Sequence, residues 1–206
     1  MTAFLDDLRT RATDGYLRKI ILPESLDERV LAAAKILAKE MLAIPLLVCN
    51  ATDSAMVRAS GLEYIIIEEE RAIALEKLLL DIRSFKVGTK DELTTEMANK
   101  MARDPLIYGM YLLRLGEADG LVAGAVRTTA EVVRAGLWLV GKAEGIQTVS
   151  SSFYMIVPAF RGGEAQEVLT FADCGVVPNP TSEQLADIAI AAADAGIEWA
   201  LYRYTV

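Results

Sequence analysis

The chain has 206 residues, with 21 basic and 29 acidic side chains, no histidine and two cysteines. Without histidine, a Ser-His-Asp triad, a Cys-His dyad and a histidine-ligated metal site are excluded, and two cysteines cannot supply a four-thiolate metal site. The net charge of −8 and the isoelectric point near 4.7 argue against a nucleic-acid partner, but they are compatible with a local basic pocket.

The chain is apolar for a soluble protein, with 53% hydrophobic residues and a mean hydropathy of +0.30. Its longest apolar runs, residues 106–113 and 121–126, are far shorter than the roughly 18 residues needed to span a bilayer. Residues 6–11 mix acidic and basic side chains, so no signal peptide is expected. We therefore expect a cytoplasmic protein without a membrane partner, whose apolar excess is packed inside or against another subunit.

Strand and helix patterns alternate through the first part of the chain. Short apolar runs predict strands at residues 19–22, 45–49 and 64–67. Helical spacing of apolar residues predicts helices at residues 2–15, 24–40, 52–60, 71–85, 89–103 and 105–115. This βαβ order predicts an α/β fold with a mostly parallel sheet covered on both faces by helices.

The pattern changes character near residue 147. A strand at 119–126 and a helix at 128–140 continue the βαβ order, whereas the last part is hairpin-like. That part contains predicted strands at 147–154 and 167–172 and a final helix at 181–195. We therefore expect a first α/β lobe at residues 1–147 and the start of a second lobe at residues 148–206.

The strand-to-helix junction at residues 120–134 is the most informative segment. Thr128 and Glu131 form a T-x-x-E capping box at the carboxyl edge of the predicted sheet, where ligands of open sheets bind. The helix N-terminus, the hydroxyls of Thr128 and Thr129, and the guanidinium groups of Arg127 and Arg134 suit an anion such as phosphate. The alternative is an ordinary capped helix in which Arg134 pairs with Glu131.

Other candidate residues also have two interpretations. Arg83, near Lys86 and Lys90, belongs either to a basic rim for a phosphorylated ligand or to the ordinary basic end of a helix. Asp27 and Arg29 either orient the edge of the crevice or form a surface ion pair.

Residues 150–152, three serines, either donate hydrogen bonds to a ligand or line a lobe boundary. Asp173 and Cys174 end a strand and offer a carboxylate and a thiol, but no histidine can activate the thiol as a nucleophile. Thr181 and Gln184 predict a second capping box with a structural role.

Seven blocks of sequence follow one another in an order that resembles a known family. They are residues 22–29 (LPESLDER), 47–50 (LVCN), 104–105 (DP), 115–125 (LGEADGLVAGA), 128–134 (TTAEVVR), 150–153 (SSSF) and 171–181 (FADCGVVPNPT). Together they are similar to the phosphate acetyltransferase (phosphotransacetylase) family, to which the phosphate butyryltransferases are related. The resemblance extends over nearly the whole chain up to about residue 195.

The resemblance implies reversible transfer of an acetyl group between coenzyme A and orthophosphate, by direct attack of the coenzyme A thiolate in a ternary complex. It implies no metal and no separate cofactor, because coenzyme A is a substrate. It also implies a homodimer of two-lobed, three-layer α/β/α subunits, similar to isocitrate and isopropylmalate dehydrogenases, with the site between the lobes. Arg83 and Arg134 match arginines associated with coenzyme A or phosphate, and Thr128 and Thr129 match hydroxyls of the substrate loop.

Two departures from the family pattern bear on activity. Arg127 stands where the family often has histidine or asparagine. After Ala195 the family continues through Ser-x-x-Gly-Ser and Asp-Leu-Ser-Arg-Gly motifs, and the second of these supplies the serine and arginine that stabilise the transition state. The tail at residues 196–206 does not match them, so the catalytic residues are unassigned and the second lobe is expected to be incomplete.

Three functional hypotheses follow from these observations. The first is an active phosphate acetyltransferase. The second is a catalytically inactive partial chain that retains coenzyme A or phosphate binding, or dimerisation. The third is a phosphate butyryltransferase.

Overall fold

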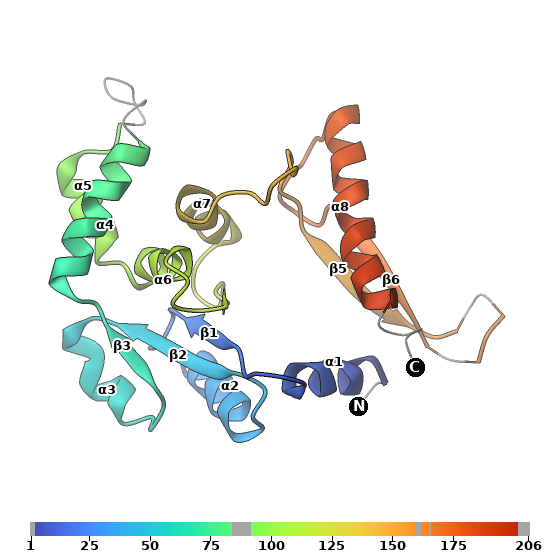
Figure 1. Ribbon diagram of the computed structural model, residues 1–206, viewed down its shortest axis with the longest axis horizontal. Helices are drawn as coiled ribbons and strands as arrows, with labels where there is room; N and C mark the ends of the chain where they lie inside the picture. The colour runs from blue at the N-terminus through green and yellow to red at the C-terminus, as the bar shows by residue number, and fades with distance from the viewer. Residues whose placement is uncertain (1–2, 84–91, 160–161, 165, 202–206) are drawn as a thin grey trace. The chain divides into compact units, whose positions relative to one another are not determined.

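The computed structural model describes residues 3–83, 92–159, 162–164 and 166–201 (Figure 1). The chain forms two compact units. The larger, Leu5–Gly141, is called the N-terminal unit, and the smaller, Lys142–Val206 together with Met1–Phe4, is called the C-terminal unit. The main division thus follows Gly141, somewhat before the lobe boundary expected at residue 147.

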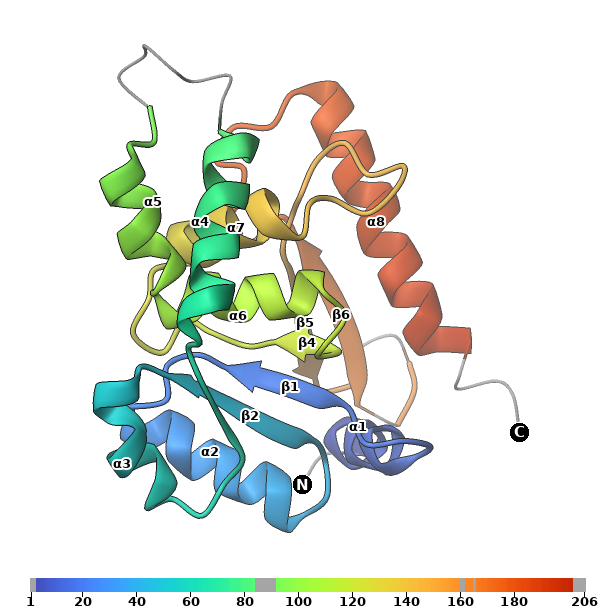
Figure 2. The same ribbon diagram turned by 60° about the vertical axis from the view of Figure 1, so that its left-hand side comes forward.

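A four-stranded parallel sheet forms the middle of the N-terminal unit, in the order β3-β2-β1-β4. Figure 1 labels β1, β2 and β3, and Figure 2 labels β4 beside β1. Its members are β1 (Lys19–Leu22), β2 (Ile44–Cys49), β3 (Tyr64–Ile66) and β4 (Gly120–Leu121). In β1, Ile21 lies opposite Leu46 of β2 and opposite Leu121 of β4. The chain winds outward from β1 to β3 and returns on the other side of β1, which creates a topological switch point between β1 and β4. The predicted α/β fold with a parallel sheet is confirmed.

Helices cover both faces of this sheet (Figure 2). Successive side chains of a strand point to opposite faces, and the apolar ones on each face are buried against helices. Ile21 and Val48 join the larger apolar core, whereas Leu22 and Leu47 join a smaller core on the opposite face. The larger core includes residues of α4 (Glu69–Ile82), α5 (Thr95–Ala102), α6 (Pro105–Arg114) and α7 (Thr129–Leu139). The smaller includes residues of α2 (Glu28–Lys39) and α3 (Ser54–Arg58), which follows the short 3-10 turn η1 (Ala51–Asp53).

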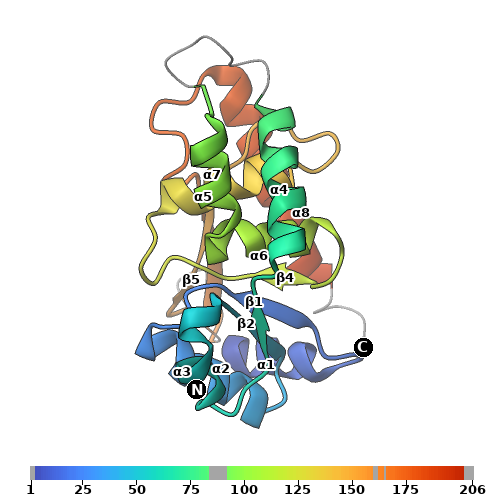
Figure 3. The same cartoon turned by 90° about the vertical axis from the view of Figure 1, so that its left-hand side faces the viewer.

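Helices α4 and α5 lie side by side in Figures 2 and 3 and make extensive contact. Helix α1 (Ala3–Thr13) precedes the sheet in the chain. None of the helices within the described ranges is long and apolar enough to cross a bilayer.

The strand predicted at residues 119–126 is wrong in length, because only β4 pairs with β1. The last ladder-like bond runs from the Val122 N–H to the Ile21 carbonyl (3.0 Å). Gly124 then takes a φ of 114°, in the left-handed region that favours glycine, and turns the chain out of the sheet. The N–H groups of residues 124–127 donate to the Glu24 carboxylate, which takes the place of a neighbouring strand as their acceptor.

Helix boundaries also differ from the prediction where a cap decides them. The helix predicted at residues 24–40 begins only after Asp27, whose carboxylate accepts the N–H of Arg29 (2.9 Å). The helix predicted at residues 89–103 begins after Thr94, which caps α5, and residues 89–91 lie outside the described residues.

The C-terminal unit contains an antiparallel hairpin of β5 (Ser152–Val157) and β6 (Glu167–Ala172), followed by α8 (Ser182–Leu201). The second strand was predicted with these bounds. The first, predicted from residue 147 to residue 154 or beyond, begins only at Ser152. Phe153 lies opposite Phe171, and the two residues are 59% and 53% exposed. The described part of this unit therefore presents aromatic residues on its two-stranded sheet.

Shortening Leu75 to alanine should lower the free energy of unfolding by about 2–5 kcal/mol, because this side chain of α4 is fully buried in the larger core. Ile73 lies on the same helix but is 43% exposed, so Ile73→Ala is a matched control with a clearly smaller loss. Urea denaturation followed by circular dichroism measures both. Equal losses would contradict the orientation of α4.

Candidate functional site

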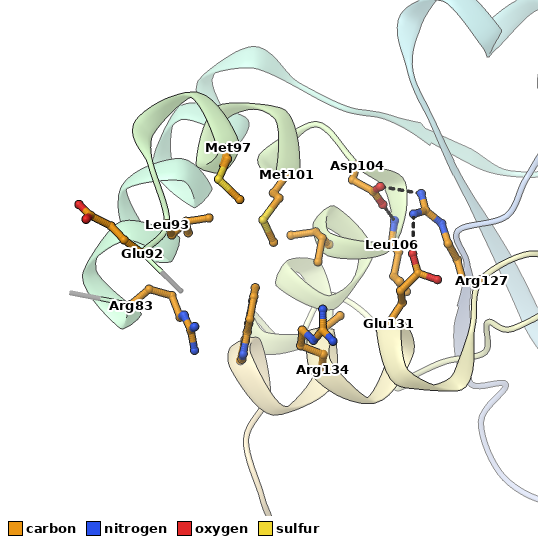
Figure 4. A pocket seen from close by; sticks show the side chains of 13 residues that line it. Arg83, Glu92, Leu93, Met97, Met101, Asp104, Leu106, Arg127, Glu131 and Arg134 are labelled. Atoms are coloured by element: carbon orange, nitrogen blue, oxygen red, sulfur yellow. Dashed lines mark hydrogen bonds and ion pairs between the residues drawn. The ribbon is translucent and has the colours of Figure 1, made fainter. Parts of the chain in front are cut away.

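A pocket of about 700 Å³ lies within the N-terminal unit, beside α7 (Figure 4). We call it the α7 pocket. Its lining comes from the end of α4, from α5 and the residues just before it, from the start of α6, and from α7 with the loop before it. The lining residues are Arg83, Glu92, Leu93, Met97, Met101, Asp104, Leu106, Ile107, Arg127, Glu131, Arg134, Ala135 and Trp138.

The structure brings three of the five predicted binding residues together in this pocket. Arg83, Arg127 and Arg134 line it. Thr128 and Thr129 do not belong to its lining, because Thr128 is the N-cap of α7 and Thr129 is the first residue of that helix. The candidate site therefore depends on guanidinium groups more than on hydroxyls.

Arg127 is already neutralised by two carboxylates. Its Nη2 atom lies 2.6 Å from Oδ2 of Asp104, and its Nη1 atom lies 3.5 Å from Oε1 of Glu131 (Figure 4). Burial alone would lower the pKa of Arg127, but the charges of Asp104 and Glu131 raise it overall. Asp104 also accepts the N–H of Leu106 as the N-cap of α6. Arg127 thus links the starts of two helices.

The predicted capping box is present at the start of α7. Thr128 Oγ1 accepts the N–H of Glu131 (3.3 Å), and Glu131 Oε2 accepts the N–H of Thr128 (2.8 Å). The N–H and the hydroxyl of Thr128 lower the pKa of Glu131. The alternative pairing of Glu131 with Arg134 is not found, because Glu131 pairs with Arg127. Over the described ranges, Arg134 is exposed and has no carboxylate within ion-pair distance.

Arg83 contributes a guanidinium at the other end of the pocket. It is the C-cap of α4, and its guanidinium carbon lies 4.7 Å from the centre of the Trp138 ring. Arg83 therefore ends a helix, as one interpretation expects, and also lines the pocket; its role toward a phosphorylated ligand stays a prediction. Lys86 and Lys90, the other members of the predicted basic rim, lie outside the described residues.

The sequence analysis did not predict that apolar side chains would line the middle of the pocket. Met97 and Met101 point from α5 toward the cavity (Figure 4). Trp138 lines it from α7. The available signal was helical spacing, because Trp138 follows Arg134 by one turn and so shares its helix face. Nothing local links these residues to Arg83, which comes from a different helix.

A second, smaller crevice of about 270 Å³ lies at the carboxyl ends of β1 and β2. Here the Glu24 carboxylate accepts four backbone N–H groups of the loop after β4. Its Oε2 atom accepts from Gly124 (3.0 Å) and Ala125 (2.8 Å), and Oε1 accepts from Val126 (2.8 Å) and Arg127 (2.7 Å). Successive main-chain N–H groups that converge on one anion form a backbone nest.

Arg29 holds the same loop from its carbonyl side. Its Nη2 atom donates to the Ala125 carbonyl (2.6 Å) and lies 2.8 Å from Oδ2 of Asp27. The hydrogen bond from the Arg29 side chain lowers the pKa of Asp27 to about 2. The surface ion pair considered from the sequence is therefore present, and the same guanidinium also contacts the edge of the crevice.

The polar residues of the C-terminal unit bond to one another. Ser151 donates both its N–H and its hydroxyl to Asp173 Oδ1 (2.8 Å each), and Ser151 Oγ accepts the N–H of Cys174 (3.1 Å). Thr181 and Gln184 form the reciprocal bonds of the predicted capping box. These contacts give the cluster a structural role at the end of β6.

Cysteine chemistry and metal binding find little support in the geometry. Cys49 is buried, and burial together with the charge of Asp53 raises the pKa of its thiol. In the part of the chain that the structure describes, no three Cys, Asp or Glu side chains are grouped so that they could hold a metal ion.

The fold and the α7 pocket define an α/β protein with a pocket of about 700 Å³ whose lining combines three arginines with three acidic side chains, two of which pair with Arg127. Residues 3–198 match the family described as phosphate acetyl/butaryl transferase. Because this match covers nearly the whole sequence, the chain belongs to the phosphate acetyl/butyryl transferase family. The resemblance found in the seven sequence blocks is thereby confirmed.

Similar proteins carry consistent names. The phosphate acetyltransferase of Acetivibrio thermocellus is 37% identical over 198 residues, which are 93% of this chain and 57% of that protein. That of Clostridium acetobutylicum is 38% identical over 182 residues, 86% of this chain and 54% of that protein. A phosphotransacetylase structure from Streptococcus pyogenes superposes with a TM-score of 0.74 at 29% identity, over 92% of this chain and 57% of that one. The chain spans just over half the length of these relatives.

Removing each arginine of the loop and of α7 should separate structural from binding roles. Arg127→Ala should lower the free energy of unfolding by about 1–2 kcal/mol, because two partly exposed carboxylates lose their cation. Arg134→Ala should change it by less than about 0.5 kcal/mol, because no ion pair among the described residues is lost. Urea denaturation measures both changes, and the reverse order would contradict this assignment.

Glu131→Gln should make the free energy of unfolding less dependent on pH in the acidic range. The folded-state pKa of Glu131 is depressed, so its charge stabilises the fold above the unfolded pKa of about 4.3, and this contribution is lost as the pH falls through the folded pKa. Wild type should therefore be the more stable protein at neutral pH, and the difference should vanish in acid. Thermal unfolding across pH measures it, with Glu28→Gln in the first turn of α2 as control.

Proposed function

We propose that the chain belongs to a phosphate acetyltransferase, which transfers an acetyl group between coenzyme A and orthophosphate. The observation that carries this proposal is the α7 pocket, in which Arg83 and Arg134 accompany Trp138. Guanidinium groups bind phosphate through paired hydrogen bonds, and an aromatic ring offers a face on which adenine can stack. The names of the relatives in the same family support the same substrates.

The reaction needs this kind of charge compensation. In one direction the coenzyme A thiolate attacks the carbonyl carbon of acetyl phosphate, the C–S bond forms, and the C–O bond to phosphate breaks as orthophosphate leaves. Both substrates are anions and the chain has a net charge of −8, so cations must be concentrated where the substrates bind. Arg134 is exposed and has no carboxylate within ion-pair distance among the described residues, so it is the cation best placed to supply that concentration on the N-terminal unit. Arg83 adds a guanidinium that lies against Trp138, and Arg127 contributes less because Asp104 and Glu131 balance it.

A second candidate function is binding without turnover. It is favoured by the coverage of the relatives, since the matched part is 57% and 54% of the two phosphate acetyltransferases. Groups that stabilise the transition state contribute a large part of an enzyme's rate, and none is assigned here. Because the family description includes butyryl as well as acetyl transfer, the acyl chain is a further choice within the first proposal.

Arg134→Ala should weaken coenzyme A binding by about tenfold, the effect expected for the loss of one charged hydrogen bond, while leaving the fold intact. Arg83→Ala should act in the same direction and also remove the contact with Trp138. Arg58→Ala, an exposed arginine of α3 outside the pocket, is the matched control and should bind as wild type does. Isothermal titration calorimetry measures the affinities. Equal affinity for Arg134→Ala and wild type would refute the pocket assignment.

Turnover is tested separately by release of free thiol from acetyl-coenzyme A in the presence of phosphate. A reaction without phosphate corrects for simple hydrolysis. Phosphate-dependent release supports the acetyltransferase. Coenzyme A binding without release supports the second candidate, and a comparison of acetyl- with butyryl-coenzyme A decides the acyl chain.

A further inference from the structure

The switch point between β1 and β4 is occupied by the protein itself. Ligands of open α/β sheets usually bind in the crevice outside the carboxyl ends of the strands at such a point. Here the Glu24 carboxylate, from the loop after β1, fills the backbone nest of residues 124–127. Gly124 has a positive φ of 114°, which lets the successive N–H groups converge.

The nest and the α7 pocket share Arg127. The last N–H that Glu24 accepts belongs to Arg127, whose guanidinium lines the pocket. The next residue, Thr128, caps α7, and Arg134 and Trp138 follow on that helix. A shift of the loop would therefore shift the start of α7 and the side chains through which the pocket holds an anion.

We propose that Glu24 is a positioning residue for the α7 pocket: its carboxylate fixes the loop at residues 124–127, and through this loop it fixes the start of α7. When the side chain is removed, a small carboxylate such as formate takes its place in the nest. The effect on coenzyme A binding rests on the proposed function, whereas the hold on the loop does not.

The chemistry of the nest requires an ionised carboxylate. Each oxygen of Glu24 accepts two N–H groups, and a glutamine amide would turn a donor toward two of these donors. Burial raises the pKa of Glu24, but the four N–H groups lower it overall, so the group is charged at neutral pH. Glu28, on the next helix, is exposed and accepts no backbone N–H groups of this loop, all of whose residues are described, which makes it a suitable control.

The experiment compares wild type, Glu24→Ala, Glu24→Gln and Glu28→Ala, each first shown to be folded by circular dichroism. Two quantities are measured with and without sodium formate, with sodium chloride matching the ionic strength. The first is hydrogen exchange of the amides at residues 124–127, and the second is affinity for coenzyme A. In both Glu24 variants, exchange should become about tenfold faster or more and affinity about tenfold weaker.

Formate should restore slow exchange and affinity in Glu24→Ala but not in Glu24→Gln, because only the alanine variant leaves room for the ion. Chloride should restore neither, and Glu28→Ala should behave as wild type throughout. Unchanged exchange in both Glu24 variants, or a loss that formate does not reverse in Glu24→Ala, would overturn the proposal. Restored exchange with coenzyme A affinity unchanged in every variant would overturn the positioning role. If wild type binds no coenzyme A, the proposed function fails, and exchange alone decides whether Glu24 holds the loop.

Discussion

The hydrogen bonds between Glu24 and residues 124–127 hold together two loops that are far apart in the sequence of the N-terminal unit. They connect the loop after β1 to a loop about one hundred residues later in the chain. Because that loop ends β4 and begins α7, the same carboxylate sets where the sheet stops and where the helix with Arg134 starts. Arg29 adds a bond to the loop from its carbonyl side, so the main chain is held through both donors and acceptors.

The order of strands and helices could be predicted from the sequence because it depends on local patterns. Apolar runs identified β1 and β3, and the capping box at Thr128 identified the start of α7. The errors lie where a distant partner decides the outcome. The strand predicted to end at Val126 stops early because Glu24 takes its N–H groups, and no pattern within the segment encodes that contact.

The candidate site could be predicted only where local patterns determine it. The junction at residues 120–134 pointed to Arg127 and Arg134, and spacing could not show which of them is neutralised. That distinction depends on Asp104, which comes from the start of another helix and pairs with Arg127. Trp138 was missed because a tryptophan on an apolar helix face is ordinarily a core residue, and only the position of Arg83 makes it part of a pocket.

The occupied nest also affects how readily the site can change its ligand. Main-chain N–H groups are present whatever the side chains are, so a site built from them tolerates substitution but is hard to retune. Here those groups are committed to Glu24, and the α7 pocket is lined instead by side chains such as Arg83 and Arg134. A single substitution at Arg83 or Arg134 therefore changes the chemistry of the pocket lining and leaves the main-chain bonds of the loop in place. The chemistry of the pocket lining and the geometry of the loop thus depend on different chemical groups, side chains in the first case and main-chain N–H groups in the second.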